Sequence, residues 1–260
     1  MNPTLKQLYN RKSIRSSQDR PLSREKIDLI LGAVRRGPTA GNLSLYSVIE
    51  VADQKKKDTL SRTCDNQPFI AKAPLVLLFL ADYQRLYAYM RQQGAAEYAA
   101  KKGLDFHAPD LGNLMLACQD ALIAAQTAVS AAESLGLGCC YIGDIIENYE
   151  EHRELFDLPD YVFPISLVVA GYPLSDYHLH RTAPRPAQEA VFFTDSYRRI
   201  EGDELAKFYD PIIKRRNPSG EFPGGAPNYA CDILQRKYAS DFAAEMKRSV
   251  EAAMRVWGRP

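Results

Sequence analysis

Residues 74–81 read Pro-Leu-Val-Leu-Leu-Phe-Leu-Ala and are the longest apolar run of the chain. The run is short, continuous and uncharged, and it predicts a strand buried on both faces. It is far shorter than the roughly 20 apolar residues that a helix needs to cross a bilayer. The segment therefore indicates a sheet covered by helices, and not a membrane span.

Helices and strands are expected to alternate along the rest of the chain. Apolar runs of strand length occur at 47–51, 139–142 and 163–170. Spacing, composition and end signals predict helices at 3–10, 23–36, 55–63, 111–135, 148–156 and 232–256. Residues 85–110 are expected to form a helix or lid followed by a loop. Strands this well separated in sequence predict an α/β or α+β sheet with helical layers.

The composition is that of an ordinary folded protein without a bulk charge bias. The chain has 260 residues, with 33 Lys and Arg against 32 Asp and Glu, so its formal net charge is +1. This balance argues against a nucleic-acid protein that relies on a basic field. The first residues lack the apolar core of a signal peptide. We therefore expect a cytoplasmic protein that binds no membrane and no nucleic acid.

Neither disulfides nor a metal site are expected. The number of cysteines is odd, and their spacing is not that of a disulfide framework: Cys64, Cys118, Cys139, Cys140 and Cys231. They are expected to be buried thiols in a reducing compartment. His178 and His180 could be ligands on one face of a strand, but no carboxylate or cysteine clusters with them. The motifs GxGxxG, GxSxG and HExxH are absent as well.

Four segments could carry chemistry, and the first is Arg11-Lys12-Ser13-Ile14-Arg15. On an extended chain Arg11, Ser13 and Arg15 share one face, and Lys12 points away. This alternation of guanidinium and hydroxyl groups suits a phosphate or an anionic ring system. The alternative is a solvated helix terminus whose cations complement the helix dipole.

The other three segments are a loop, a strand end and a proline-flanked stretch. Gly37–Tyr46 combines two glycines with small polar residues, so its backbone can approach a ligand closely. Gly136–Asp144 contains Tyr-Ile-Gly and can present backbone N–H groups. His180–Pro186 holds two arginines in a rigid setting. A plain turn, a core strand and a solvated loop are the respective alternatives.

In this order and at these distances, the four segments resemble the nitroreductase / flavin reductase family, and its NADPH-dependent FMN reductases in particular. Arg11–Arg15 looks like the family's opening motif. Asn66-Gln67, Asp82–Arg85 and Tyr141–Gly143 are similar to the same branch, and Pro184–Pro186 looks like a further family segment. The resemblance covers about residues 1–200.

The resemblance implies an α+β fold in which a central mixed antiparallel sheet is flanked by helices. It also implies an intertwined homodimer with FMN at the dimer interface. Residues 1–260 would form a single domain, with a core at about 1–200 and a C-terminal helical extension at about 201–260.

The family's FMN contacts, carried over by motif, fall on residues from all four segments and on one glutamine. They are Arg11, Lys12, Ser13, Arg15, Thr39, Ala40, Asn42, Gln67, Tyr141, Ile142, Gly143, Arg181 and Arg185. Arg185 would bind the phosphate, and a cation such as Arg15 would stabilise the anionic reduced flavin. Arg215 and Arg216 would bind the 2′-phosphate of NADPH, or else form a solvated basic run at a helix end.

The implied function is that of an FMN-dependent NAD(P)H oxidoreductase. NAD(P)H would reduce FMN, leave, and be replaced by a nitroaromatic, a quinone or a flavin in a ping-pong cycle. No catalytic side chain is expected, since the flavin carries the redox chemistry. The alternatives are a specialised member, such as a reductive dehalogenase or a flavin-modifying enzyme, and a flavin-binding protein with little turnover.

The chain departs from the family pattern at four places. Asp144 stands where the branch often has glycine, and Ala183 stands where the family has lysine. Ser44-Leu-Tyr46 replaces Gln-Pro-Trp, and residues 85–110 are longer than usual. An acidic side chain beside the flavin would lower its potential or alter access to it, and the longer segment would add a lid.

Overall fold

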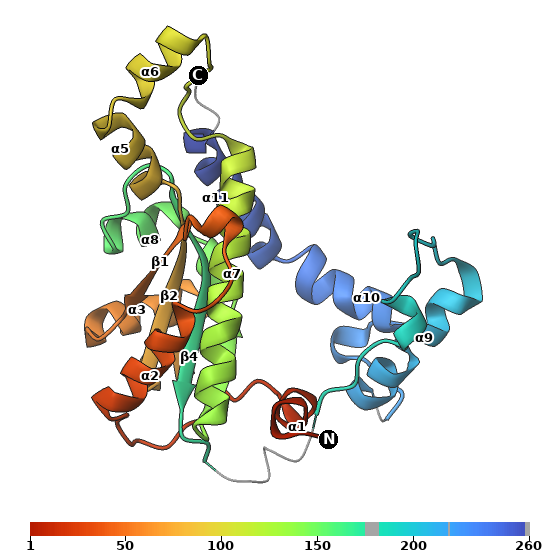
Figure 1. Cartoon of the computed structure of the whole chain (residues 1–260). Helices are drawn as coiled ribbons and strands as arrows, with labels where there is room; N and C mark the ends of the chain where they lie inside the picture. The colour runs from red at the N-terminus through yellow and green to blue at the C-terminus, as the bar shows by residue number, and fades with distance from the viewer. Residues whose placement is uncertain (175–181, 218, 258–260) are drawn as a thin grey trace. The chain divides into compact units, whose positions relative to one another are not determined.

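The computed structural model describes residues 1–174, 182–217 and 219–257 (Figure 1). Its contacts divide the chain into two compact units, Met1–Leu179 with Ala244–Pro260, and His180–Ala243. The first unit contains the sheet, and the described part of the second consists of helices and connecting loops. A single domain with an extension from about residue 201 stays a prediction.

The sheet has four antiparallel strands in the order β1-β2-β4-β3. Their bounds are Tyr46–Glu50 for β1, Leu75–Asp82 for β2, Gly138–Ile142 for β3 and Val162–Gly171 for β4. A register shift in the β2–β4 ladder lies between Phe79 and Leu80. The α+β class is therefore confirmed. A parallel contact is added by one isolated bridge, between Ser13 and Cys139.

β2 is buried along its whole length, as its continuous apolar sequence predicts. Leu75, Leu77 and Phe79 belong to one core cluster, which includes residues of α2 (Arg24–Val34) and α7 (Leu111–Ser134). Val76, Leu78 and Leu80 belong to the cluster on the other face of the sheet. Alternate side chains of a strand point to opposite faces, so the two helical layers bury residues 75–80 from opposite sides, and Ala81 is buried in a third cluster.

The second face of the sheet is covered by three short helices. They are α3 (Gln54–Thr63), α4 (Phe69–Lys72) and α8 (Tyr149–Leu155). Leu60 and Ile70 are completely buried there against β2. Asp53 caps α3 by accepting the Lys56 N–H at 2.9 Å, and Ser23 caps α2 by accepting the Lys26 N–H at 3.3 Å.

α7 runs along the sheet on its other face (Figure 1). Asp110 and Asn113 form a reciprocal capping box at its start. The buried side of α7 is rich in alanine, and small side chains allow a helix to lie close to a sheet. By length and composition alone α7 could cross a membrane, but 50% of its most apolar window is buried in the fold. That burial is typical of a core helix.

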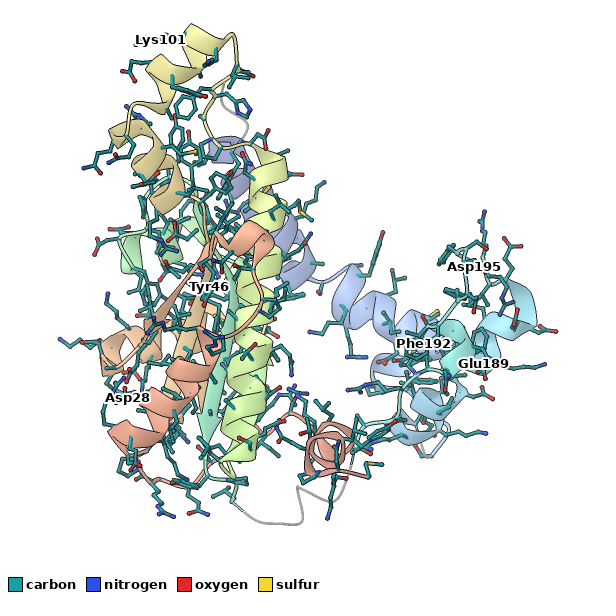
Figure 2. The ribbon with its side chains drawn as sticks, viewed as in Figure 1. Asp28, Tyr46, Lys101, Glu189, Phe192 and Asp195 are labelled. Atoms are coloured by element: carbon teal, nitrogen blue, oxygen red, sulfur yellow. The ribbon has the colours of Figure 1, made fainter. Side chains whose placement is uncertain are left out.

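Residues 85–110 form two helices and a loop. These are α5 (Gln84–Gln92), α6 (Ala95–Lys102), on which Figure 2 labels Lys101, and residues 103–110, which are neither helix nor strand. Tyr87 of α5 stacks on Phe106 with ring centroids 5.8 Å apart, and its edge meets Tyr161 at 5.7 Å. The loop is thus held against α5 by an aromatic contact.

The ends of the chain add further helices. α1 (Pro3–Asn10) begins at Asn2, whose side chain accepts the Leu5 N–H at 2.9 Å. α11 (Asp241–Trp257) buries Trp257 completely in a third core cluster, where its ring meets Tyr161 at 5.6 Å. The second unit contains η4 (Gln188–Ala190), α9 (Gly202–Arg216), η5 (Pro223–Gly225), α10 (Tyr229–Ile233) and the π-helical turn η6 (Leu234–Tyr238).

The single helix predicted at 232–256 is wrong. The chain instead forms α10, then η6, and starts a new helix at Asp241. The Ala239 N–H donates to the Leu234 carbonyl at 2.8 Å, which is the wider spacing of a π turn. The Ala243 N–H then donates to the carbonyl and hydroxyl oxygens of Ser240, which satisfies a donor of the new helix. Ser240 is therefore a sequence signal for a new helix start. The regular spacing of the apolar residues across 232–256 suggested one continuous helix instead.

We predict that Gly138→Ala destabilises the protein. A Cβ at residue 138 would lie 2.7 Å from Cβ and Cγ1 of Ile14, both within a buried contact. The expected cost is about 1–3 kcal/mol of unfolding free energy, because the packed neighbours must shift. Urea unfolding followed by circular dichroism measures it.

Gly32→Ala is the matched control. Gly32 lies inside α2, and a Cβ there would meet no atom within 4 Å. This substitution should stabilise the protein by up to about 1 kcal/mol, since alanine loses less backbone entropy in a helix. Equal unfolding free energies for Gly138→Ala and the wild type would refute the close contact.

Candidate functional site

The segment Arg11–Arg15 lies along the free edge of β3. Ser13 forms a parallel bridge with Cys139, and the Ile14 N–H donates to the Cys139 carbonyl at 2.9 Å. Ile14 is buried against Gly138, whereas Ser13 and Arg15 are exposed. The predicted alternation therefore holds for residues 13–15. It directs a hydroxyl and a guanidinium away from the core.

Arg11 occupies a partly buried position at the same edge. Its guanidinium lies over the ring of Tyr141, 5.8 Å from the centroid. Its Nε lies 3.6 Å from Oε1 of Glu133 but is too far away for a hydrogen bond, and it has no hydrogen-bond partner among the described residues. A buried guanidinium donor without a hydrogen-bond acceptor is unusual. Such a donor is available to bind an anion.

The thiol of Cys140 lies close enough to Arg11, Ser13 and Arg15 for all three to affect its pKa. Burial raises its pKa, while Arg15, a hydrogen bond from Ser13, and Arg11 act in the opposite direction. Burial also raises the pKa of the Cys139 thiol to about 12. Thiols held in the protonated form are poor nucleophiles, so neither cysteine of β3 is suited to covalent catalysis.

Gln67 and Asp144 meet at the end of β3. Gln67 follows two residues with positive φ, Asp65 and Asn66, which turn the chain back after α3. Its Nε2 donates both to the Cys64 carbonyl at 2.9 Å and to Oδ2 of Asp144 at 2.7 Å. Both amide hydrogens are therefore used, and the amide oxygen of Gln67 is left to accept from a ligand.

Tyr141, Ile142 and Gly143 lie between this pair and Arg11. The side chain of Ile142 is buried, and the Tyr141 hydroxyl donates to Oε1 of Gln126 at 3.2 Å. A Cβ at Gly143 would meet no atom within 4 Å, so the strand ends in open space. Asp144 then starts the short helix η2 (Asp144–Ile146). Arg11 and Arg15 therefore lie along the same edge of β3 whose end carries the oxygen acceptors of Gln67 and Asp144.

The loop Gly37–Leu45 is held by a buried carboxylate. Asp120 of α7 is only 1% exposed, and it accepts the Ala40 N–H at 2.8 Å and the Leu45 N–H at 3.0 Å. The loop contains η1 (Ala40–Asn42), and the Ser44 N–H donates to Oγ1 of Thr39 at 3.2 Å. Figure 2 labels Tyr46, the residue of β1 at which this loop ends.

Sequence reasoning missed Asp120. Its signal was a single carboxylate within the alanine-rich helix, between Ala117 and Ala121 on the buried side. A charged group in such a setting needs hydrogen-bond donors. The sequence could not indicate that the donors are backbone N–H groups some 75–80 residues away.

No hydrogen bond or ion pair among the described residues joins the loop to Arg11. Both are attached to α7, the loop at Asp120 and Arg11 at Glu133. These two positions are 13 residues apart, which corresponds to roughly 20 Å along a helix axis at 1.5 Å per residue. The two regions also approach each other along α7: the Tyr141 ring beneath Arg11 contacts Gln126, and a Cβ at Gly37 of the loop would lie 3.2 Å from Oγ1 of Thr127.

The remaining candidate residues belong to the second unit or fall outside the described residues. Arg185 and Arg215 are exposed, and the Arg215 guanidinium donates to the Thr182 carbonyl. Arg181, His178 and His180 lie outside the described residues, as does the side chain of Arg216. Among the described residues no group of three or more His, Cys, Asp or Glu could hold a metal ion.

The chain is similar to a known family and to proteins with assigned activities. The model of the nitroreductase family matches residues 8–172. An FMN reductase [NAD(P)H] of Bacillus subtilis is 38% identical over 207 residues, which cover 79% of this chain and 78% of that protein. An FMN reductase (NADPH) of the same organism is 34% identical over 254 residues, covering 94% and 98%. The solved structure of B. megaterium NfrA2 is 30% identical, with a TM-score of 0.77 over 97% of this chain and 98% of the other.

Proposed function

The chain belongs to the nitroreductase family, and we propose that it is an FMN-dependent NAD(P)H oxidoreductase of the cytoplasm. The observation that carries the proposal is the edge of β3. There Arg11, Ser13 and Arg15 gather beside Tyr141–Gly143, and Gln67 and Asp144 meet at the strand's end. Cations next to oriented hydrogen-bonding groups suit an anionic cofactor with a polar ring.

The residues present fit FMN. Bound FMN would accept a hydride from NAD(P)H and pass electrons on to a second substrate. The Nε of Arg11, which makes no hydrogen bond among the described residues, and the side chains of Lys12 and Ser13 would bind phosphate and ribityl oxygens. Arg15 would stabilise negative charge on the reduced ring, and the free oxygen of Gln67 would accept from a ring N–H or a hydroxyl. Arg181 and Arg185 would add charge at the phosphate.

We propose further that each site is completed by a second copy of the chain. Among the described residues no hydrogen bond or ion pair joins the loop to Arg11 within one protomer. Exposed apolar side chains on α1 and α7 supply a surface for an intertwined homodimer: Leu5, Leu8, Met115, Leu122 and Ile123. Each site would then contain residues of both protomers. One protomer would contribute Arg11 and Arg15, and the other would contribute Thr39, Ala40 and Asn42. The C-terminal helices would embrace the partner.

NAD(P)H and the acceptor are proposed to use the same open face of the flavin in turn. The space beyond Gly143 is open in the chain, so an acceptor has access at the strand's end. Electron-poor aromatic acceptors such as nitroaromatics, quinones and flavins are the proposed class. Because one site serves both substrates, the cycle is ping-pong.

Reconstitution with FMN tests the proposed function. The protein should bind FMN and show a flavin absorption band that NAD(P)H bleaches without oxygen and a quinone restores. Steady-state rates at several quinone concentrations should give parallel double-reciprocal lines. A protein that refuses FMN would refute the proposal, and intersecting lines would refute only the ping-pong cycle.

Mixed dimers test the shared site. Arg15→Ala and Asn42→Ala homodimers should each bind FMN about tenfold or more weakly, because each lesion removes hydrogen bonds from both sites. In a dimer with one protomer of each kind, one site would carry both lesions and the other would carry neither. FMN titration by fluorescence should then show one wild-type site per dimer. Two equally weakened sites would show that each site lies within one chain.

Arg215 and Arg216 are proposed to bind the 2′-phosphate of NADPH. Arg215 is exposed near the end of α9, and its chemistry suits a phosphate. Arg215→Ala/Arg216→Ala should raise the KM for NADPH about 10–100-fold and leave that for NADH unchanged. Lys207→Ala/Arg199→Ala removes two exposed cations from the same unit and is the control. An unchanged NADPH/NADH ratio would assign the two arginines to a solvated helix end.

A further inference from the structure

The ion pair between Arg11 and Glu133 is longer than a structural ion pair usually is, and it contains no hydrogen bond from Nε of Arg11. Nε of Arg11 and Oε1 of Glu133 are 3.6 Å apart, at side-chain exposures of 20% and 11%. Within the described residues Nε makes no hydrogen bond, although it is buried. A stabilising buried pair is short and fully hydrogen-bonded, whereas this pair is loose and leaves its donor available.

The place of Glu133 in the fold disfavours its negative charge. It lies in the last turn of α7, whose terminal carbonyl groups carry partial negative charge. Burial raises the pKa of Glu133 to about 7, and Arg11 opposes that shift. Among the described residues, the thiol of Cys139 and the hydroxyl of Tyr141 on β3 also face it. Lys26 of α2, also near this end of α7, donates its ammonium group to the Leu135 carbonyl at 3.1 Å.

We propose that Glu133 is a positioning residue for Arg11: it holds the guanidinium over Tyr141 until the phosphate of FMN replaces it, and it takes up one proton when that phosphate binds. The inference rests on the proposed function, because it requires Arg11 to contact the phosphate. The proton comes from solvent and stays on the Glu133 carboxyl. No bond of the cofactor is formed or broken.

The physical reason is competition for one cation. An incoming phosphate brings almost two negative charges to the guanidinium, and an ionised Glu133 beside it would repel that anion. Protonation removes the repulsion and leaves a carbonyl oxygen that can still orient Arg11. Tyr141 contributes a ring face that keeps the guanidinium in place while its partner changes.

The sign of the pH dependence follows from this competition. FMN binding raises the pKa of Glu133 above its value in the free protein. The affinity gained from protonated Glu133 is therefore fully present below about pH 7 and is lost as the pH rises above it. FMN should bind more weakly in alkaline solution, even though the phosphate, whose second pKa is about 6, gains negative charge as the pH rises from about 6.5.

Titration of FMN into the full-length apoprotein between pH 6.5 and 8.5, followed by flavin fluorescence, tests the inference. The wild-type Kd should rise about tenfold across this range. Glu133→Gln keeps an oxygen that can orient Arg11 but cannot titrate, so its Kd should change less than about twofold. Calorimetry at pH 7.5 in two buffers of different ionisation enthalpy should show proton uptake by the wild type and none by the variant.

Three controls separate the explanations. Glu50→Gln removes a carboxylate from the ion pair with Arg24 elsewhere in the unit and should leave the wild-type pH profile intact. Riboflavin, which lacks the phosphate, should bind without the pH dependence. Glu133→Ala should bind FMN more weakly than Glu133→Gln at pH 6.5, because Arg11 loses its orienting oxygen.

The outcomes distinguish this inference from the proposed function. Identical pH profiles and proton uptake for the wild type and Glu133→Gln would overturn the role of Glu133 and leave FMN binding established. A lower melting temperature of Glu133→Gln with an unchanged profile would likewise reduce Glu133 to a structural residue. Absence of FMN binding by the wild type at every pH would overturn both.

Discussion

The burial of β2 on both faces is the constraint on which the rest of the sheet depends. The side chains of residues 75–80 alternate between two core clusters on opposite faces of the sheet, so a register slip of one residue would exchange the two apolar sets. β1 and β4 occupy its two sides, and β3 follows β4 at the edge. An edge strand exposes unpaired backbone groups, and at Cys139 the segment Arg11–Arg15 supplies a partner for them.

Covering that edge has an electrostatic consequence. The covering segment carries three cations, and its pairing register directs Ser13 and Arg15 outward while Ile14 is buried against Gly138. The balanced charge of the whole chain thus conceals a local concentration of positive charge at one strand. Glu133 is the carboxylate placed against it, at a helix end that disfavours its charge. In our proposal this site binds an anion, and a counter-charge that can be neutralised favours that binding.

α7 organises the site at a larger scale. One carboxylate of this helix, Asp120, holds the loop 37–45, and another, Glu133, faces Arg11. The rigidity of a helix of 24 residues keeps these two positions apart. In our proposal a second copy of the chain completes the site, and a flavin nucleotide contacts the loop of one protomer and the cations of the other.

The sequence by itself determined the elements whose signals are local. The strand at 74–81, the helix at 111–135 and the cap at Ser23 are periodicity or capping patterns that act over a few residues, and the structure has them within one residue of the predicted bounds or caps. The resemblance carried by Arg11–Arg15 and Tyr141–Gly143 also led to the family. The tertiary structure alone decided which distant groups meet. Asp120 with the loop, Glu133 with Arg11 and Gln67 with Asp144 are contacts between residues 75 or more positions apart. Such pairs depend on how the sheet and helices pack. The burial pattern of one segment predicts which of its residues face the core, but it does not identify the residue of another segment that each one contacts.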